Sequence, residues 1–366
     1  MTSPSEPTAQ TRRALGVDAH AAAISSRREH FLTLYNFSEG HGLEIGPLDS
    51  AISDASLERV AYVDVFDTDG IRSHYANDEN VLIDLIPEID YPLYVDGGMR
   101  TLAEAAAPGA PFDWVIASHV IEHVPDVIGW LRQVAELAAD DGALILAVPD
   151  RRYCFDRHRP PTTTGQAIQA YESADSRPSI RAVYDFFTTA VAVDTGALWA
   201  GRRPPGFSAR MHDRATVTAM MERCRAGEYV DCHVWTFTPE SFVEQVRELR
   251  HLGLCDWYVE KLVPVVGGLE FHAVLRRLRR DGSSADVDLE EPEAGSDMPD
   301  WLFDEWTARA DVRRQSRKIR RLRKRNRRLR RERDALAGSR RMRVGSVIVE
   351  PLARIRRVLR RGASGM

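Results

Sequence analysis

The chain has 366 residues, 43% of them hydrophobic and 28% charged, which suits one large domain with appendages or two domains with a buried core. Its four cysteines form no C-x-x-C pair, which argues against a zinc site and against a disulfide framework. No apolar run is long enough to span a bilayer and the N-terminus shows no secretory signal, so we expect a cytoplasmic protein.

Charge is distributed unevenly along the chain. Residues 301–366 hold 23 Lys/Arg against 6 Asp/Glu, a net charge of +17, and since the whole chain carries −4 the remainder carries −21. An acidic body with a basic tail predicts that the tail meets an anionic partner or an acidic face of its own protein. The alternative is a solvated helix.

The predicted elements begin after a polar segment, residues 1–20, that we expect to be disordered. Beyond it, short apolar runs alternate with helical patterns. The strongest helical pattern, residues 126–142, ends at Gly142, a predicted C-terminal cap. The predicted strands of this region are "GLEIG" (42–46), "RVAYVDVF" (59–66), "IDYPLYVDG" (89–97), "FDWVIASH" (112–119) and "ALILAVPD" (143–150).

Residues 151–237 are irregular and rich in Arg, Thr, Pro and aromatic residues, which predicts a substrate cap inserted after the fifth strand. The α/β pattern then resumes. We therefore predict that residues 21–280 form one α/β domain with a doubly wound, mostly parallel, seven-stranded Rossmann-like sheet. The returning elements are a helix at 238–254 and two strands at 256–265 and 269–278, joined through Gly267–Gly268.

The C-terminal region divides into an acidic, Ser/Gly/Pro-containing stretch (281–300), a predicted flexible linker, and the basic helical tail (301–366). Residues 312–336 carry a weak seven-residue repeat, which predicts a coiled coil that forms a homodimer, binds an acidic partner, or contacts nucleic acid or a membrane. Residues 349–361 form a basic amphipathic pattern that suits an anionic membrane surface or the chain's own acidic body. Nucleic acid is disfavoured because no aromatic residue follows Trp306.

The stretch "GLEIGPLDS" raises the question of which ligand the first strand serves. A dinucleotide needs further glycines for its pyrophosphate, and they are absent after Gly46. A nucleoside without phosphates still needs the tight turn of Gly46 and an acid for its ribose, such as Asp64, which lies 20 residues after Glu44. This pattern predicts S-adenosylmethionine (SAM).

Several motifs, taken in order, resemble the class I SAM-dependent methyltransferases: "LEIG", "YVDVF", "YVDGG" and the run from "FDWVIASH" to "LILAVPD". Within that family the chain resembles the branch of the ubiquinone-biosynthesis methyltransferases. "SHVIEHVPD" and "VPDRRYCFD" more narrowly resemble bacterial methyltransferases found beside, or fused to, glycosyltransferases of surface-polysaccharide pathways. The resemblance covers roughly residues 40–160 and 238–278.

The resemblance implies a set of SAM-contacting residues along the carboxyl ends of the strands. The absent second and third glycines leave open the shape of the loop and the strength of the SAM site. Turn, cap or ion-pair roles are the alternatives for the acidic members. The implied residues are Glu44 near the methionine amino group, Gly46 and Pro47 beneath the methionine, Asp64 at the ribose hydroxyls, Asp96 near the adenine amino group, and Ser118 and His119 at the methyl-donor end.

The motif "SHVIEHVPD" is the first candidate for catalysis, because a sugar hydroxyl is poorly acidic and a base near neutral pKa helps to remove its proton. His123 is either that base or a residue that fixes the loop. In the ubiquinone O-methyltransferases that the motif resembles, two acids and a histidine can hold a divalent metal. Here His119 replaces one acid beside Glu122 and His123, and we assign no metal.

The motif "PDRRYCFDRHRPPTT" follows the fifth strand. Asp150 is a candidate to orient or deprotonate the acceptor, and Tyr153 and Phe155 are candidates to stack on a sugar. The alternative is a surface loop in which arginines pair with Asp150 and Asp156. The arginines expected to grip an anionic acceptor are Arg151, Arg152, Arg157 and Arg159.

The motif "YVDCHVWTFTPESF" alternates Asp231, His233 and Trp235, which would share one face of a strand. His233 is therefore a further candidate base in a sugar-binding wall. The alternative is an edge strand that packs Trp235 into the core.

These patterns predict a SAM-dependent O-methyltransferase of a saccharide or glycan intermediate, cytoplasmic or peripheral at the inner membrane face. Its basic tail would recruit a glycosyltransferase or an anionic membrane. The alternatives are a methyltransferase of quinone-like or other small molecules, and a degenerate methyltransferase fold that acts as a scaffold.

Overall fold

The computed structural model describes residues 24–78, 81–200, 206 and 209–278. All of them belong to the first of two units, Met1–Ala285 and Asp286–Met366. The expected disordered N-terminus, acidic linker and basic tail, with its coiled coil and amphipathic helix, lie outside the described residues.

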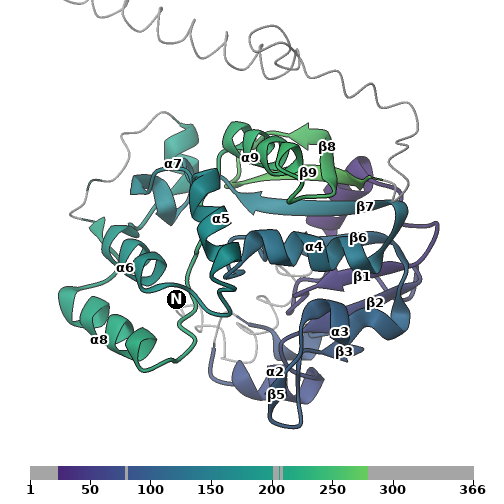
Figure 1. Ribbon diagram of the computed structural model, residues 1–366, viewed down its shortest axis with the longest axis horizontal. Helices are drawn as coiled ribbons and strands as arrows, with labels where there is room; N and C mark the ends of the chain where they lie inside the picture. The colour runs from purple at the N-terminus through teal and green to yellow at the C-terminus, as the bar shows by residue number, and fades with distance from the viewer. Residues whose placement is uncertain (1–23, 79–80, 201–205, 207–208, 279–366) are drawn as a thin grey trace, which may run out of the picture. The chain divides into compact units, whose positions relative to one another are not determined.

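The core of the fold is a seven-stranded sheet of order β3-β2-β1-β6-β7-β9-β8 (Figure 1). All pairings from β3 to β7 are parallel, and β9 is antiparallel to both β7 and β8. This confirms the predicted doubly wound, mostly parallel α/β sheet and its closing hairpin. The strands are β1 (Gly42–Ile45), β2 (Val60–Asp64), β3 (Tyr91–Pro92), β6 (Phe112–Ser118), β7 (Ala138–Pro149), β8 (Trp257–Val263) and β9 (Glu270–Arg277).

The strand order reverses between β1 and β6, which pair in register from Gly42 with Trp114 to Ile45 with Ala117. The chain runs from β1 outward to β2 and β3, and from β6 outward to β7. Ligands of open α/β sheets bind at the carboxyl ends of the strands beside such a reversal. The fold therefore places the loops after β1, β2, β6 and β7 around one candidate site.

Short helices connect the strands and make up the cap. Figure 1 shows α5 to α8 grouped to one side of the sheet. The elements outside the sheet are α2 (Thr68–His74), η1 (Ile83–Leu85), β4 (Tyr94–Val95), β5 (Gly98–Met99), α3 (Leu102–Ala106), η2 (Ala107–Gly109), α4 (Val127–Leu137), η3 (Phe155–His158), α5 (Thr164–Glu172), α6 (Ile180–Thr189), α7 (Thr195–Trp199), α8 (Arg214–Arg225) and α9 (Pro239–His251).

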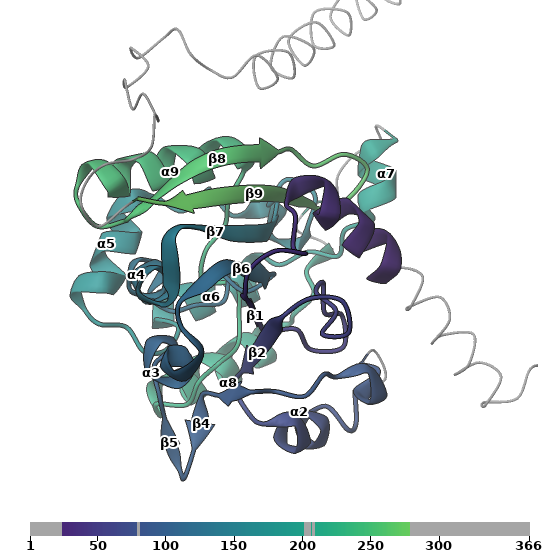
Figure 2. The same cartoon turned by 90° about the vertical axis from the view of Figure 1, so that its right-hand side faces the viewer.

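The crossover from β1 to β2 contains no helix, since residues 46–59 form turns and bends. A helix over residues 24–34 instead packs beside β9 (Figure 2), where its His30 lies 3.3 Å from His272, and Lys261 of β8 donates to the carbonyl of Thr33 at 3.0 Å. Phe31 of this helix joins the core cluster with Trp114 and Ile145, and all three are fully buried. The N-terminal helix thus helps to cover the sheet.

Two predicted boundaries were wrong. Helix α4 ends at Leu137 rather than at Gly142, because Ala138 is extended and already pairs with Phe112 of β6. The predicted third strand is reduced to Tyr91–Pro92, and the chain then turns through a separate hairpin, β4–β5. Asp96 and Gly97, both with positive φ, make the two-residue turn of that hairpin, as the Asp-Gly pair favours.

The cap prediction holds in part. Residues 151–237 do leave the sheet, but the segment 228–236 forms no strand, so the predicted strand at Asp231, His233 and Trp235 was wrong. The backbone of this segment instead bonds to the loop after β6, with the amides of Val234 and Trp235 both donating to the carbonyl of Glu122, at 2.7 and 3.1 Å.

Candidate active site

The turn after β1 needs its glycine. Gly46 has φ of +64°, and a Cβ there would lie 3.1 Å from Val120 in the loop after β6. Its amide donates to the carbonyl of Val63 at 2.9 Å, which ties the turn to β2. Pro47 follows at once. The turn therefore has no side chain at position 46 beside the strand reversal, and the contact of Gly46 and Pro47 with a ligand stays a prediction.

Asp64 ends β2, and its carboxylate accepts a hydrogen bond from the amide of Val65 at 2.6 Å. Burial raises the pKa of Asp64 to about 6, and the Val65 amide only partly opposes this shift. The nearby phenol of Tyr75 has a raised pKa because of burial and the charges of Asp64 and Asp231. Tyr75 therefore lies within electrostatic range of both the predicted ribose acid and Asp231 of the cap.

Glu44 is fully enclosed and serves the β1–β2 loop. Its carboxylate accepts from the amides of Ile52 and Ser53, at 2.7 and 2.8 Å, and from the Ser53 hydroxyl. Burial raises the pKa of Glu44 and these hydrogen bonds oppose the shift. The predicted contact of Glu44 with methionine stays a prediction, as does that of Asp96, an exposed residue of the β4–β5 turn.

Ser118 and His119, at the end of β6, are tied to β9 and to the N-terminal helix. Arg27 donates to the Ser118 hydroxyl at 2.6 Å and to Glu270 at 2.8 Å, while His119 Nε2 bonds to Glu270. Burial alone would lower the pKa of His119, but Glu122 and Glu270 outweigh it and raise the pKa to about 9. His119 is therefore an imidazolium held in an ion-pair network.

His123 forms a dyad with Asp231 of the cap, with 2.8 Å between His123 Nδ1 and Asp231 Oδ1. Burial would lower the pKa of His123, but the hydrogen bond and charge of Asp231 raise it above the ordinary value. The dyad leaves Nε2 as the available nitrogen. An imidazole oriented by a carboxylate in this way is a suitable general base.

His233 forms a second dyad, buried behind the first. Its Nδ1 lies 2.5 Å from Asp156 Oδ2, and Arg159 donates to Asp156 at 2.9 Å. Burial would raise the pKa of Asp156, but His233 and Arg159 hold it below the ordinary value. The rings of His123 and His233 meet edge to face, with centroids 4.7 Å apart. The structure thus brings together two predicted bases from segments 110 residues apart in sequence.

Asp150, the remaining predicted base, has both carboxylate oxygens engaged by Arg152. It is fully buried, and Arg152 donates to both of its oxygens through its main-chain amide and its guanidinium. Arg157 donates to the carbonyl of Arg152, and Arg159 to those of His233 and Val234. These contacts correspond to the ion-pair alternative for this loop, and they leave Asp150 poorly placed to serve as a base.

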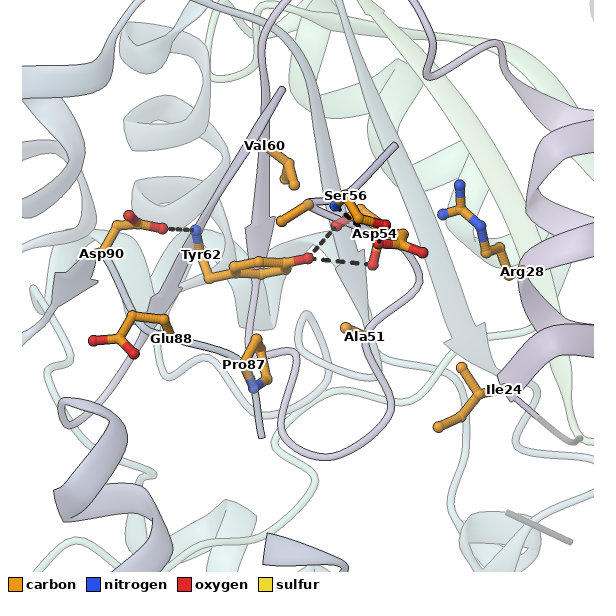
Figure 3. Close-up of a pocket in the computed structure, with 12 residues that line it drawn as sticks. Ile24, Arg28, Ala51, Asp54, Ser56, Val60, Tyr62, Pro87, Glu88 and Asp90 are labelled. Atoms are coloured by element: carbon orange, nitrogen blue, oxygen red, sulfur yellow. Dashed lines mark hydrogen bonds between the residues drawn. The ribbon is translucent and has the colours of Figure 1, made fainter. Parts of the chain in front are cut away.

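A cavity of about 450 Å³ lies elsewhere, between the N-terminal helix and β2. Figure 3 shows Tyr62 in its middle, with Arg28 and Asp90 on opposite sides. Its lining contains none of the predicted SAM or catalytic residues. It is therefore distinct from the strand reversal.

Sequence reasoning did not single out Asp156 as the partner of His233. The only available signal was an acidic residue followed by Arg159 three positions later, and many surface loops share that pattern. Glu122 was noted only as a potential ligand in a set with His119; the structure pairs His119 with Glu122, at 3.4 Å between Nδ1 and Oε1, and also with Glu270.

A family model described as a methyltransferase domain matches residues 19–224, more than half of the chain. The chain belongs to this methyltransferase-domain family. The matched region spans the strand reversal, Asp64, His123 and most of the cap. No curated protein sequence matches the chain. Among its described residues, no helix combines the length and apolar character needed to cross a bilayer.

Solved methyltransferase structures are similar to this methyltransferase domain at low identity. The mitomycin 7-O-methyltransferase MmcR is 13% identical with a TM-score of 0.33, over 73% of this chain and 57% of that protein. Magnesium protoporphyrin IX methyltransferase (ChlM) from Synechocystis PCC 6803 with bound SAH gives 11% and 0.30, over 75% and 90%. The glycopeptide N-methyltransferase MtfA with sinefungin gives 12% and 0.34, over 69% and 93%. None of these values identifies an acceptor for this chain.

Proposed function

We propose that this chain is a SAM-dependent methyltransferase that methylates a hydroxyl group of a saccharide or glycan intermediate. The observation that carries the proposal is the His123–Asp231 dyad beside the strand reversal. SAM would supply an electrophilic methyl group whose carbon bonds to the acceptor oxygen while the C–S electron pair stays on sulfur. The chain's own residues have to hold this donor, position the acceptor and take up its proton.

The residues at the strand reversal fit the donor. Gly46 keeps side-chain atoms away from the turn where the methionine would lie. Among the described residues, the Asp64 carboxylate accepts a hydrogen bond from the amide of Val65, at a place where two ribose hydroxyls would supply further donors. Such donors would stabilise ionised Asp64 in this half-buried position, which supports its assignment to the ribose.

The acceptor proton would go to Nε2 of His123. Asp231 holds Nδ1 and stabilises the imidazolium that forms, and Tyr229 reaches the His123 carbonyl at 3.4 Å. A sugar hydroxyl is a weak acid and gains more from such a base than a phenol does. This difference supports a saccharide acceptor.

A quinone-like or other aromatic acceptor is the second candidate, and one observation favours it. Two aromatic rings of the cap stand against His233, with Phe155 at 4.6 Å and Phe186 at 5.9 Å between ring centroids. The arginines expected to grip an anionic acceptor bond to main-chain carbonyls and carboxylates instead. An uncharged aromatic acceptor would therefore fit beside Phe155 and Phe186 better than an anionic one.

Calorimetry with SAM tests the donor site, and labelled SAM tests the acceptor. The wild type should bind SAM at one site, and label should appear in the saccharide fraction of a cell-envelope extract. Label in a lipid-soluble aromatic fraction would support the second candidate. A wild type that binds no SAM would favour the non-catalytic scaffold and overturn both.

A further inference from the structure

We propose that Glu122, His123 and His233 bind one divalent transition-metal ion, with Zn²⁺ as the representative ion. One potential ligand atom from each of the three side chains lies within 4.8 Å of the other two. Glu122 and His123 come from the loop after β6, whereas His233 comes from the cap segment before α9. The site exists only in the folded chain.

The Glu122 carboxylate is the first argument for an ion. Glu122 is 1% exposed, yet neither of its oxygens accepts a hydrogen bond from any described residue. His119 Nδ1 lies 3.4 Å and His233 Nε2 4.0 Å from Glu122 Oε1. A buried carboxylate without hydrogen bonds is costly. The His119 imidazolium, shared with Glu270, offsets part of the Glu122 charge, and a bound cation would supply the direct ligand bond that the carboxylate lacks.

The orientation of the two histidines is the second argument. Asp231 engages Nδ1 of His123 and Asp156 engages Nδ1 of His233, so Nε2 is the free nitrogen in both. Metal-binding histidines almost always have such an outer carboxylate or carbonyl, which fixes the ring and raises its basicity. Arg159 in turn holds Asp156 and the carbonyl of His233.

The donor set indicates the kind of ion. Two imidazole nitrogens and one carboxylate suit Zn²⁺, Fe²⁺ or Mn²⁺ better than Mg²⁺ or Ca²⁺, which prefer oxygen. Ligand atoms around tetrahedral Zn²⁺ are about 3.3 Å apart, so the ligand atoms of the three side chains would close in by up to roughly 1.5 Å. Three protein ligands leave a position open, as in catalytic rather than structural zinc sites.

The role of the ion in catalysis rests on the proposed function, whereas its binding does not. An acceptor hydroxyl at the open position would have a lowered pKa and release its proton to solvent water, and its oxygen would then take the methyl group. With the ion bound, Nε2 of His123 is a ligand and solvent water takes the proton; in the metal-free chain His123 keeps the role of base given under the proposed function. His119 stays outside the set because it is held by Glu270.

Calorimetry with ZnCl₂ on the chelator-treated full chain, without SAM, tests the site. We expect one equivalent of Zn²⁺ to bind, far more tightly than Mg²⁺. Glu122→Gln and His233→Gln should each weaken Zn²⁺ binding at least 100-fold. Asp156→Asn, which frees the His233 ring, should weaken it about 10- to 100-fold. His212→Gln is the matched control, because His212 packs on Phe187 without joining the set, and it should bind Zn²⁺ like the wild type.

Two results would overturn the inference: wild type that takes up no stoichiometric Zn²⁺, or Glu122→Gln and His233→Gln variants that bind it as tightly as the wild type. If these variants do not fold, the absorption spectrum of Co²⁺ bound to the wild type decides. Imidazole ligands at low coordination number give intense bands, and the spectrum of hydrated Co²⁺ would contradict the site. SAM binding measured on the same sample shows separately whether the proposed function stands.

Discussion

Glu122 and Asp150 are both buried carboxylates just beyond the ends of neighbouring strands, β6 and β7, and their surroundings are opposite. Asp150 accepts three kinds of donor from Arg152, and none of the described residues donates a hydrogen bond to the oxygens of Glu122. Saturated partners make a buried carboxylate a structural element, whereas missing partners mark a place that a ligand can complete. At this edge of the sheet, Asp150 therefore supports the fold, whereas Glu122 is open to binding by a ligand.

The largest loss of activity should come from substitution of His123, which is next to Glu122 in sequence. His123→Ala removes the base, or a metal ligand, and should lower kcat by about 100- to 10,000-fold with SAM affinity nearly unchanged. Steady-state kinetics with the identified acceptor measure it. His41→Gln, at the opposite end of β1, serves as control. An equal loss of activity in both variants would remove His123 from the chemistry.

Arg152→Ala, which removes the hydrogen-bond partner of Asp150, should lower the stability of the fold rather than the catalytic rate. It strands Asp150 as a buried charge, and we expect a loss of about 3–5 kcal/mol in the free energy of unfolding. Urea denaturation measures this loss. The double variant Asp150→Asn/Arg152→Ala should recover part of it, because no charge remains buried. A loss below about 1 kcal/mol would show that the pair is exchangeable with water.

Asp64 lies at the carboxyl end of β2, where we propose that SAM, the methyl donor, binds. Asp64→Ala should weaken SAM binding by about 1.5–3 kcal/mol, the range for a hydrogen bond to a charged group, or roughly 10- to 150-fold. Calorimetry measures this change. Asp67→Ala, which removes only the N-cap of α2, is the control. SAM affinity that survives Asp64→Ala would exclude Asp64 from the ribose site.

The pKa of about 6 at Asp64 makes SAM affinity depend on pH. The ionised carboxylate is the better acceptor for ribose hydroxyls, so affinity should fall about tenfold between pH 7 and pH 5, as the ionised fraction falls. Because this pKa is raised by folding, the group's contribution to the stability of the ligand-free protein is full below pH 3.8 and is lost as pH rises through 6. Asp64→Asn should flatten the affinity profile. A wild-type profile as flat as that of the variant would show that Asp64 does not titrate in this range.

The smallest effect returns to Glu122. Glu122→Gln removes a buried charge that lacks hydrogen bonds and, with it, the ion pair to His119. Because these two effects oppose each other, the free energy of unfolding in metal-free buffer should change by less than about 1 kcal/mol. The same urea denaturation that destabilises Arg152→Ala should thus leave this variant unharmed. A loss of 2 kcal/mol or more would mean that His119 and His233 already stabilise the carboxylate as ion-pair partners.

Local patterns predicted most of the sheet. Alternating apolar runs located β1, β2, β6 and the final hairpin, because buried strands need continuous apolar sequence. The end of α4 was missed because strand pairing at Ala138 outweighs the capping preference of Gly142. The turns of residues 46–59, in place of a helix, depend on the buried Glu44, whose hydrogen-bond partners a one-dimensional pattern does not reveal.

The site was less accessible to prediction. His123 and His233 were identified as candidates from their motifs, and Asp64 from its spacing after Glu44 and from the family resemblance. Their pairing was not, because Asp231 and Asp156 reach the histidines across 108 and 77 residues of sequence. Asp150 was chosen for its position after β7, and nothing in the sequence distinguishes its pairing with Arg152 from exposure to solvent.

The two amides of Val234 and Trp235 that converge on the carbonyl of Glu122 restrict how the cap can open. A hinge at this junction would break both bonds and pull His233 away from the carboxylate, so acceptor entry and product departure must use another path. Crosslinking the 120–124 loop to the 231–235 segment should consequently leave turnover intact.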